Sequence, residues 1–370
     1  MYQPTPREAL ITLNLIPGLG SIRIQSLLEF FGSAELVLQA PAPMLERVQR
    51  IGPVQAAAIA DWRNCTNAPA EMEAAAQMGV RMVTLTDADY PAALRRMPDP
   101  PIVLYVRGAW QEQDAERSVA IVGTRRATPY GMTVARQFGR DLADSSCTII
   151  SGLARGIDTA AHLGALDAGG RTIAVLGFGL AEFYPPENAE LAARIADGHG
   201  ALVSEFPLFM RPSRNTFPQR NRIVAAWSRA TLVVEAPNRS GALHTATMAE
   251  GTYGNRVFAV PGAVSSPASS GCHALIRDGA TLCTCAHELV EDMHWGTPRQ
   301  LNLFEQQITP ADLPDSPESR LLHALHSGHD TLDALCSALG MGAGELNPLL
   351  MAMQIRGQIT PLPGARFRAN

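Results

Sequence analysis

The sequence predicts an α/β protein whose largest domain holds a doubly wound, mostly parallel sheet. Between residues 80 and 294, short runs of Val, Ile and Leu alternate with segments of helical periodicity. Strands that crossover helices bury on both faces have this near-continuous apolar character. In addition, two of the runs lead into a glycine turn that carries arginine, and such sheets bind anions at these turns. We therefore expect an extended Rossmann-like sheet with a further domain on either side.

The composition allows more than one domain. The chain has 370 residues, 46% of them hydrophobic, which is enough for two or three cores. Its formal net charge is −5, so a surface for nucleic acid has to be a local patch. All 30 basic residues are arginine. The absence of lysine excludes Walker-type phosphate loops, pyridoxal Schiff bases and lysine nucleophiles.

Residues 1–75 are expected to form a helical domain. Apolar residues recur at helical spacing over 9–16 and 22–31, and a PGLG turn at 17–20 separates the two stretches. This pattern is typical of a helix-hairpin-helix, in which a glycine turn directs backbone amides at a DNA phosphate. A weaker copy, RIGP, stands at 50–53 and lacks one of the expected glycines. A SAM-like helical domain that uses glycine only to turn between helices is equally compatible with the pattern.

Residues 76–295 make up the predicted sheet domain. Helical stretches lie between most of its strands, so the connections are crossovers and the strands run parallel. Ligands then bind at the carboxyl ends of the strands. The expected strands are 81–85, 119–122, 148–150, 172–176, 201–204, 231–234 and 257–260.

Two strand-to-helix turns of this domain are predicted to bind phosphate. Glycine lets backbone N–H groups approach an anion, the helix N-terminus adds partial positive charge, and arginine offers a planar fork of donors. One turn follows the strand 119–122 and the other follows the strand 148–150, so both lie at the same edge of the sheet. The candidate residues are Gly123, Thr124, Arg125 and Arg126 in the first turn, and Ser151, Gly152, Arg155 and Gly156 in the second.

Two further segments carry candidate nucleic-acid contacts. The run RNTFPQRNR at 214–222 places arginines and a phenylalanine at a predicted helix start, where guanidinium groups can hold phosphates while the ring stacks on a base. Arg220 and Arg222 lie about 200° apart on a helix, so we expect one of them to pair internally. The segment 239–246 again opens a helix with a glycine turn, and a purely structural turn explains it equally well. The candidates are Arg214, Phe217, Gln219, Arg220, Asn221, Arg222, Arg239, Ser240, Gly241 and Thr245.

The C-terminal part is expected to be separate. Residues 296–317 are rich in Pro, Asp, Gln and Ser, which indicates a linker. Residues 318–370 offer two helices over 318–339, a third over 344–356 and a small hairpin over 358–368. Three helices and a two-stranded wing are typical of a winged-helix-like domain. The third helix has few side chains suited to reading bases, so contact with protein is an equal alternative to contact with DNA.

Other chemistry has weak support. The stretch 176–182 has only the first two glycines of a dinucleotide-binding fingerprint, so no nicotinamide cofactor is expected. Cys283, Cys285 and His287 alternate, but no second ligand pair has zinc spacing, and a short strand entering a helix explains them more simply. Asp158 and His162 resemble a catalytic pair, although capping and packing are their commoner roles. We therefore predict no catalytic residues, no cofactor and no metal.

The sequence also predicts where the protein is located. Its six cysteines are scattered, and its first residues are polar without an apolar signal core. No run reaches the roughly 18 to 20 apolar residues of a membrane span. A reducing cytoplasmic setting without membrane attachment is therefore expected.

The sheet domain contains a long series of ordered motifs. They are DYP from residue 89, IVGTRRATPYG from 121, SGLARGIDTAAH from 151, YPPEN from 184, SEFP from 204, FPQRNRIVAAWS from 217, RSGALHTA from 239 and VFAVPG from 257. Together they resemble the DNA-processing protein A (DprA/Smf) family. The resemblance implies a dimeric cytoplasmic protein without established catalysis. Such a protein binds and protects single-stranded DNA during natural transformation and helps to load the RecA recombinase. The family's DNA pocket would map here to Arg125, Arg214 and Phe217.

Two other functions stay open at this point. A Rossmann-like nucleoside-monophosphate hydrolase could combine an arginine turn with Glu205 or Glu235, although the proline-and-glycine phosphate loop of such enzymes is absent. Alternatively, the sheet could be mainly a dimerisation scaffold, with DNA bound by the terminal domains. Release of free base from nucleoside monophosphates, or DNA binding by residues 76–296 alone, would separate these alternatives from a single-strand DNA binder.

Overall fold

The computed structural model describes residues 3–295, 317–355, 358–362 and 366–369. The chain divides into two compact units, Met1–Gly296 and Thr297–Asn370. The predicted linker lies outside the described residues except for its last position, which begins a helix. The domain boundary proposed near residue 75 stays a prediction.

The first unit is built around a nine-stranded sheet of order β1-β2-β6-β5-β4-β3-β7-β8-β9. β2 is antiparallel to its neighbours β1 and β6, and the other described pairs are parallel. The predicted fold class is therefore confirmed. The strands are β1 (Arg81–Thr84), β2 (Val103–Gly108), β3 (Ser118–Val122), β4 (Thr148–Ser151), β5 (Thr172–Leu176), β6 (Gly200–Ser204), β7 (Ala230–Val233), β8 (Arg256–Ala259) and β9 (Thr281–Leu282).

The predicted strands are all present, but β2 was missed. Only the four-residue helix α8 (Ala92–Arg95) separates it from β1, so the alternation of strands with long helices gave no sign of it. The structure confirms the simple interpretation of Cys283 and Cys285, because β9 leads through them into helix α15 (Ala286–Asp292).

Helices cover both faces of the sheet. Alternate residues of β3 point to opposite faces: Val119 and Ile121 pack in one core with α9 and α10, while Ala120 and Val122 pack in another with α12 and α13. This two-sided burial explains why the middle positions of the parallel strands are mostly apolar, with polar residues mainly at the strand ends. The helices of this region are α9 (Pro129–Asp144), α10 (Ile157–Asp167), α11 (Ala189–Arg194), α12 (Thr216–Trp227), α13 (Gly241–Gly251) and α14 (Ser270–Arg277).

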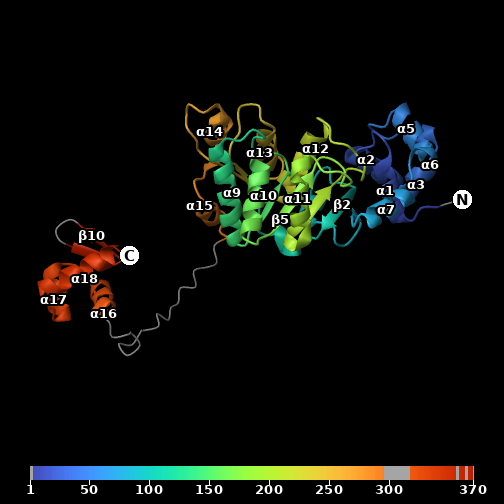
Figure 1. Ribbon diagram of the computed structural model, residues 1–370. Helices are drawn as coiled ribbons and strands as arrows, with labels where there is room; N and C mark the ends of the chain where they lie inside the picture. Colours follow the sequence, from blue (N-terminus) through green and yellow to red (C-terminus); the bar gives the residue numbers. More distant parts are fainter. Residues whose placement is uncertain (1–2, 296–316, 356–357, 363–365, 370) are drawn as a thin grey trace. The chain divides into compact units, whose positions relative to one another are not determined.

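The N-terminal helices gather at one end of the first unit, beside β2 (Figure 1). The two helices of the predicted hairpin are present as α1 (Pro6–Leu15) and α2 (Ser21–Phe31), and Gly18 turns between them with φ of 75°. The weaker copy at 50–53 is also a turn of this type, because Arg50 adopts φ of 70° where glycine was expected. The remaining helices are α3 (Ala34–Gln39), α4 (Ala42–Leu45), α5 (Pro53–Ala60), α6 (Trp62–Cys65) and α7 (Ala68–Gln77).

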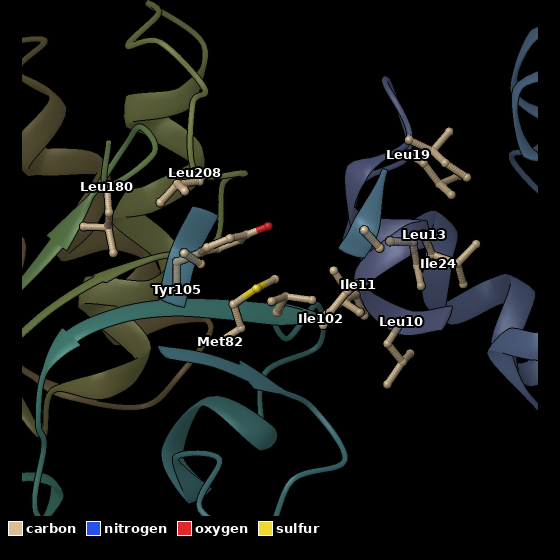
Figure 2. Close-up of a cluster of buried hydrophobic side chains, with 14 of the residues drawn as sticks. Leu10, Ile11, Leu13, Leu19, Ile24, Met82, Ile102, Tyr105, Leu180 and Leu208 are labelled. Atoms are coloured by element: carbon tan, nitrogen blue, oxygen red, sulfur yellow. The ribbon is translucent and has the colours of Figure 1, made fainter. Parts of the chain in front are cut away.

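The helical segment and the sheet share one hydrophobic core. Figure 2 shows leucines and isoleucines of α1 and α2 facing Met82 of β1, Tyr105 of β2 and Ile102, which directly precedes β2; Leu180 and Leu208 lie on the far side of Tyr105 from the helices. Polar contacts add to this interface: Arg7 donates to the carbonyl of Met82 at 2.5 Å. The two parts are therefore rigidly joined, and side chains from both can contribute to one surface.

The second unit has the predicted winged-helix order. Helices α16 (Pro317–His326), α17 (Leu332–Leu339) and α18 (Ala343–Ile355) precede the antiparallel strands β10 (Ile359–Leu362) and β11 (Arg366–Ala369). A small core of its own includes Leu321, Leu335, Leu350 and Ile359.

Candidate nucleic-acid interface

A pocket of 760 Å³ opens at the carboxyl edge of the sheet, where both arginine turns were expected. Five segments form its walls: the turn after β3, the segment after β4 through Ala154 and Asp158, the loop after β5, the segment that leads into α12, and the segment that leads into α13. It brings together many of the predicted site residues, namely Gly123, Thr124, Arg125, Arg126, Arg214, Phe217, Arg220, Asn221, Ser240, Gly241 and Thr245.

The centre of this pocket is an arginine above an aromatic ring. The Arg125 guanidinium carbon lies 4.4 Å from the centroid of the Phe217 ring, within cation–π range. Tyr184 adds a second ring at 6.3 Å from Phe217. Gly177 makes room for this arrangement, because a Cβ at that position would lie 3.0 Å from the Phe217 ring. The result is an apolar surface of two rings tilted by 44°, with a positive charge over the ring of Phe217.

The turn that carries Arg125 is held tightly from behind. The Thr124 amide donates to the backbone carbonyl of Glu235 at 2.7 Å. A Cβ on Gly123 would collide with Ile157, and one on Gly156 would collide with the Thr124 carbonyl. Gly156 also has φ of 80°, so glycine is required there for two reasons. These contacts fix the backbone while the arginine side chains stay exposed.

The rim of the pocket adds further donors. Arg126 and Arg214 are exposed, and Ser240 caps the N-terminus of α13 by accepting from the Ala242 amide. A helix N-terminus next to free guanidinium groups favours anions. The pocket can therefore hold phosphates at its rim and a flat apolar group at its centre.

The second arginine turn differs from the prediction, because its amides already have an anion. The buried Asp158 carboxylate accepts from the amides of Gly152 at 3.1 Å and Ala154 at 3.4 Å. Burial raises the pKa of Asp158, and Arg220 opposes that rise. Arg155 turns away from the pocket and pairs with Glu187 at the surface. Ser151, Gly152, Arg155 and Gly156 are consequently not among the pocket-lining residues.

The arginines of α12 are both used internally. Arg220 is 3% exposed and donates to the carbonyls of Gly152, at 2.7 Å, and Val175. Burial lowers its pKa to about 10. Arg222 pairs with Glu205 and, at 3.2 Å, with Asp99. We expected one of the two to face a phosphate; the geometry instead assigns Arg220 to holding the second turn and Arg222 to a different pocket.

Other predicted residues also lie outside the main pocket. Gln219 lines the same neighbouring pocket as Arg222. Arg239 is exposed, with φ of 67°, and is not among the lining residues of the main pocket. Sequence reasoning missed Tyr184, Pro212, Ser213 and Pro237, which do line it. Tyr184 stands in one of the ordered motifs, so that motif was the available signal.

The two residues considered as a catalytic pair, Asp158 and His162, have structural partners. His162 is fully buried, and its Nδ1 lies 2.7 Å from the Thr172 hydroxyl. Burial lowers the pKa of His162 to about 3, which keeps its ring neutral. Asp158 is the sole carboxylate among the described residues that line the main pocket.

The two glutamates weighed for a hydrolase lie elsewhere. Glu235 accepts from the Thr128 amide and hydroxyl, and Glu205 pairs with Arg222. Within the described ranges, no cluster of three or more His, Cys, Asp or Glu side chains could hold a metal ion. A search of the same residues for a helix long and apolar enough to cross a membrane also finds none.

The fold and the pocket define a Rossmann-like protein with a basic and aromatic site at the carboxyl edge of its sheet. The family model of DNA recombination-mediator protein A matches residues 81–294, and that of the DprA winged helix domain matches residues 305–365. The chain therefore belongs to the DNA recombination-mediator protein A (DprA/Smf) family. This membership places it among DNA-processing proteins, and the resemblance seen in the sequence is confirmed.

Relatives support the assignment over nearly the whole chain. Protein Smf of Synechocystis sp. is 33% identical over 95% of this chain and 96% of its own length. A putative DNA processing protein DprA of Mycobacterium tuberculosis is 42% identical over 86% of this chain and 85% of its own length.

Two solved structures resemble this one. DNA processing protein A of Streptococcus pneumoniae is 30% identical, with a TM-score of 0.66 over 79% of this chain and 99% of that one. DNA processing protein A of Helicobacter pylori, whose structure was described for its single-stranded DNA binding mode, is 30% identical. Its TM-score is 0.52 over 58% of this chain and 96% of that one.

Proposed function

We propose that the protein is a single-stranded DNA binder and recombination mediator, and that the pocket of Arg125 and Phe217 is its DNA site. The observation that carries this proposal is the guanidinium of Arg125 held 4.4 Å above a half-buried aromatic ring. When Arg125 moves from the ring to a phosphate, an unpaired base can stack on the ring face that it leaves, and Arg126 and Arg214 can contact the flanking phosphates. A base inside a duplex is already stacked, so single strands are preferred.

The partners implied by the family resemblance are part of the same proposal. The protein would act in the cytoplasm during natural transformation, as a homodimer, and would protect incoming strands and transfer them to the RecA recombinase. No catalytic step is needed for this role. The site fits that role because it can hold DNA through phosphates and base faces, which is largely independent of sequence.

Fluorescence anisotropy with a labelled single strand and its duplex, over a salt series, tests the proposal. Affinity should fall as salt rises, with a log–log slope near −0.7 per phosphate neutralised on a single strand. Arg125→Ala and Arg214→Ala should each weaken binding about ten- to a hundredfold and make the slope shallower. Arg96→Ala is the matched control, because Arg96 is exposed and lines neither the main pocket nor its neighbour. Equal affinity of all four proteins would exclude this pocket as the DNA site.

A further inference from the structure

A second pocket lies between the helical segment and the sheet, and the proposed function does not use it. Its volume is 840 Å³. One wall is the hairpin turn between α1 and α2, and the other is the segment that follows β6. We call it the hairpin pocket. Its lining residues include Ile16, Gly18, Leu19, Gly20, Ile22, Arg23, Arg50, Asp99, Glu205, Phe206, Phe209, Met210, Gln219 and Arg222.

The hairpin pocket is continuous with the DNA site through one stretch of chain. Phe209 and Met210 line the hairpin pocket, whereas Pro212, Ser213 and Arg214 line the DNA site a few residues later. Helix α12 also contributes to both pockets: Arg222 lines the hairpin pocket and Asn221 lines the DNA site. The two pockets are therefore neighbours, because residues 209–214 and α12 contribute to both.

The walls of the hairpin pocket offer exposed apolar surface. Phe209 is 63% exposed, Ile22 is 44% exposed and Met210 is 40% exposed. Such side chains are costly to leave in water, and aromatic or long apolar groups are suitable surfaces for the faces of unpaired bases.

The floor holds a polar atom without a partner. Glu205 has a side chain that is only 10% exposed, and Arg222 occupies its Oε2, while its Oε1 has no hydrogen-bond partner among the described residues. Burial raises the pKa of Glu205 to about 7, Arg222 opposes the rise and Asp99 adds to it. This carboxyl group can therefore donate or accept a hydrogen bond near neutral pH. A buried polar atom left unsatisfied is costly, so a polar group of a base that reached Oε1 on binding would gain a favourable hydrogen bond.

The rim can hold phosphate. The first turn of α2 has amide N–H groups without intrahelical acceptors, and nothing lies within 4 Å of a Cβ built on Gly18 or Gly20, so the turn is open. Arg23 donates from Nε to the Arg50 carbonyl at 3.0 Å and from Nη1 to the Gly18 carbonyl at 2.6 Å. It thereby joins the two hairpin turns and adds a fixed positive charge beside the amides.

We propose that the hairpin pocket is a second subsite for single-stranded DNA, which takes nucleotides of the strand that leaves the site of Arg125 and Phe217. The proposal rests on the proposed function. It adds that the bound DNA strand runs across residues 209–214 toward the start of α2. Phe209 stacks on a base, Glu205 contacts the edge of a base, and the amides of α2 with Arg23 hold a phosphate.

The test compares strand lengths in a matched pair of variants. Gly20→Asp and Gly20→Ser both supply an N-cap side chain at a position with ordinary φ of −84° and open space, so both should fold. Only the aspartate places a negative charge where the phosphate would lie. Anisotropy is measured with oligothymidylates of about 5 and about 16 nucleotides, the short one filling one site and the long one both.

Gly20→Asp should weaken binding of the long strand about tenfold and leave the short strand unchanged, while Gly20→Ser should match the parent protein with both strands. Phe209→Ala should likewise weaken only the long strand, about tenfold. Leu36→Ala is its control, because Leu36 is an exposed apolar residue of α3 that does not line the hairpin pocket. Photocrosslinking of a long strand carrying 4-thiothymidine should label the 205–210 segment.

The result that overturns the subsite is a long strand bound equally by the parent, Gly20→Asp and Phe209→Ala, with no crosslink to that segment. The pocket would then be left for a protein partner. If the parent protein binds neither strand length, the proposed function itself fails, so the two failures are distinguishable.

Discussion

The turn after β3 and the turn after β4 share the order strand, glycine, arginine and helix, yet only the first leaves its positive charge available. Arg125 in the first turn lies over Phe217 and faces the pocket. In the second turn, Arg155 pairs with Glu187 and the amides bind Asp158. Two turns of the same sequence type thus differ, because the chain itself supplies an anion to the second turn, whereas Arg125 of the first turn stays available to a ligand.

A glycine and arginine turn before a helix has the groups needed to bind a phosphate. Whether these groups are available to a ligand depends on which side chains of the folded protein already contact them. In the second turn, the Asp158 carboxylate takes the place that a bound phosphate would have, between the turn amides and Arg220. These internal contacts hold the second turn in place beside the pocket that Arg125 and Arg126 of the first turn face. Substitutions that remove these contacts of the second turn should therefore affect stability, whereas substitutions in the first turn should affect DNA binding.

Asp158→Ala should cause the largest loss. It leaves two amides and the buried Arg220 guanidinium without their carboxylate, which costs about 3 kcal/mol or more of unfolding free energy. Asp158→Asn keeps an acceptor and should cost less. Urea unfolding followed by circular dichroism measures both. If Asp158→Ala unfolds at the urea concentration of the parent protein, the second turn is not filled by this carboxylate.

His162 lies on α10, the helix that the second turn begins, and it should make this region sensitive to acid. Its folded pKa of about 3 lies below the unfolded value of 6.5, so the unfolded chain takes up the proton first. The stability contributed by neutral His162 is present above about pH 6.5 and is lost as pH falls toward 3. By pH 4 this loss amounts to about 3 kcal/mol.

His162→Leu should therefore lose less stability than the parent protein between pH 7 and pH 4, as measured by urea unfolding at a series of pH values. Parallel pH profiles for the two proteins would show that the imidazole is not held neutral in the folded state.

Because Arg125 and Phe217 are in contact, the effects of their substitutions on DNA affinity should depend on each other. In a double-mutant cycle with Arg125→Ala and Phe217→Leu, the two effects on single-strand affinity should be non-additive by about 1 kcal/mol, because the ring orients the guanidinium. Additive effects would mean that the two side chains act separately. Circular dichroism of each variant serves as the folding control.

Arg155→Ala should have the smallest effect. Arg155 and Glu187 form an exposed surface pair, and neither lines the DNA site. Neither thermal stability nor single-strand affinity should change measurably. A loss of affinity comparable to that of Arg125→Ala would break the comparison, since it would return the second turn to the DNA site.

The sequence alone predicted most of the architecture, because burial imposes strong patterns on strands and helices. The family resemblance implied that Arg125, Arg214 and Phe217 share one pocket, and the structure brings the three together. The sequence could not predict the pairing of Arg220 with the Gly152 carbonyl, or of Arg155 with Glu187. Those contacts join positions between 32 and 68 residues apart, and no local pattern encodes them.

Strand β2 was missed for a related reason. Val103–Gly108 is apolar like the other strands, but it is antiparallel and pairs with β6 across a long stretch of sequence. The alternation of strands and crossover helices predicts only parallel strands, so it does not predict an antiparallel strand such as β2. The hairpin pocket was also beyond prediction, because it depends on how the helical segment docks against this strand.

The core shared by the helical segment and the sheet has a consequence for any shortened form of this chain. Tyr105 and Leu208 are fully buried in that core, together with side chains of α1 and α2. A chain that lacked residues 1–75 would present these groups to water as an adhesive apolar patch, which promotes aggregation. The helical segment is therefore not an independent domain that can be removed or replaced without effect. A replacement would have to cover the same apolar side chains of the sheet.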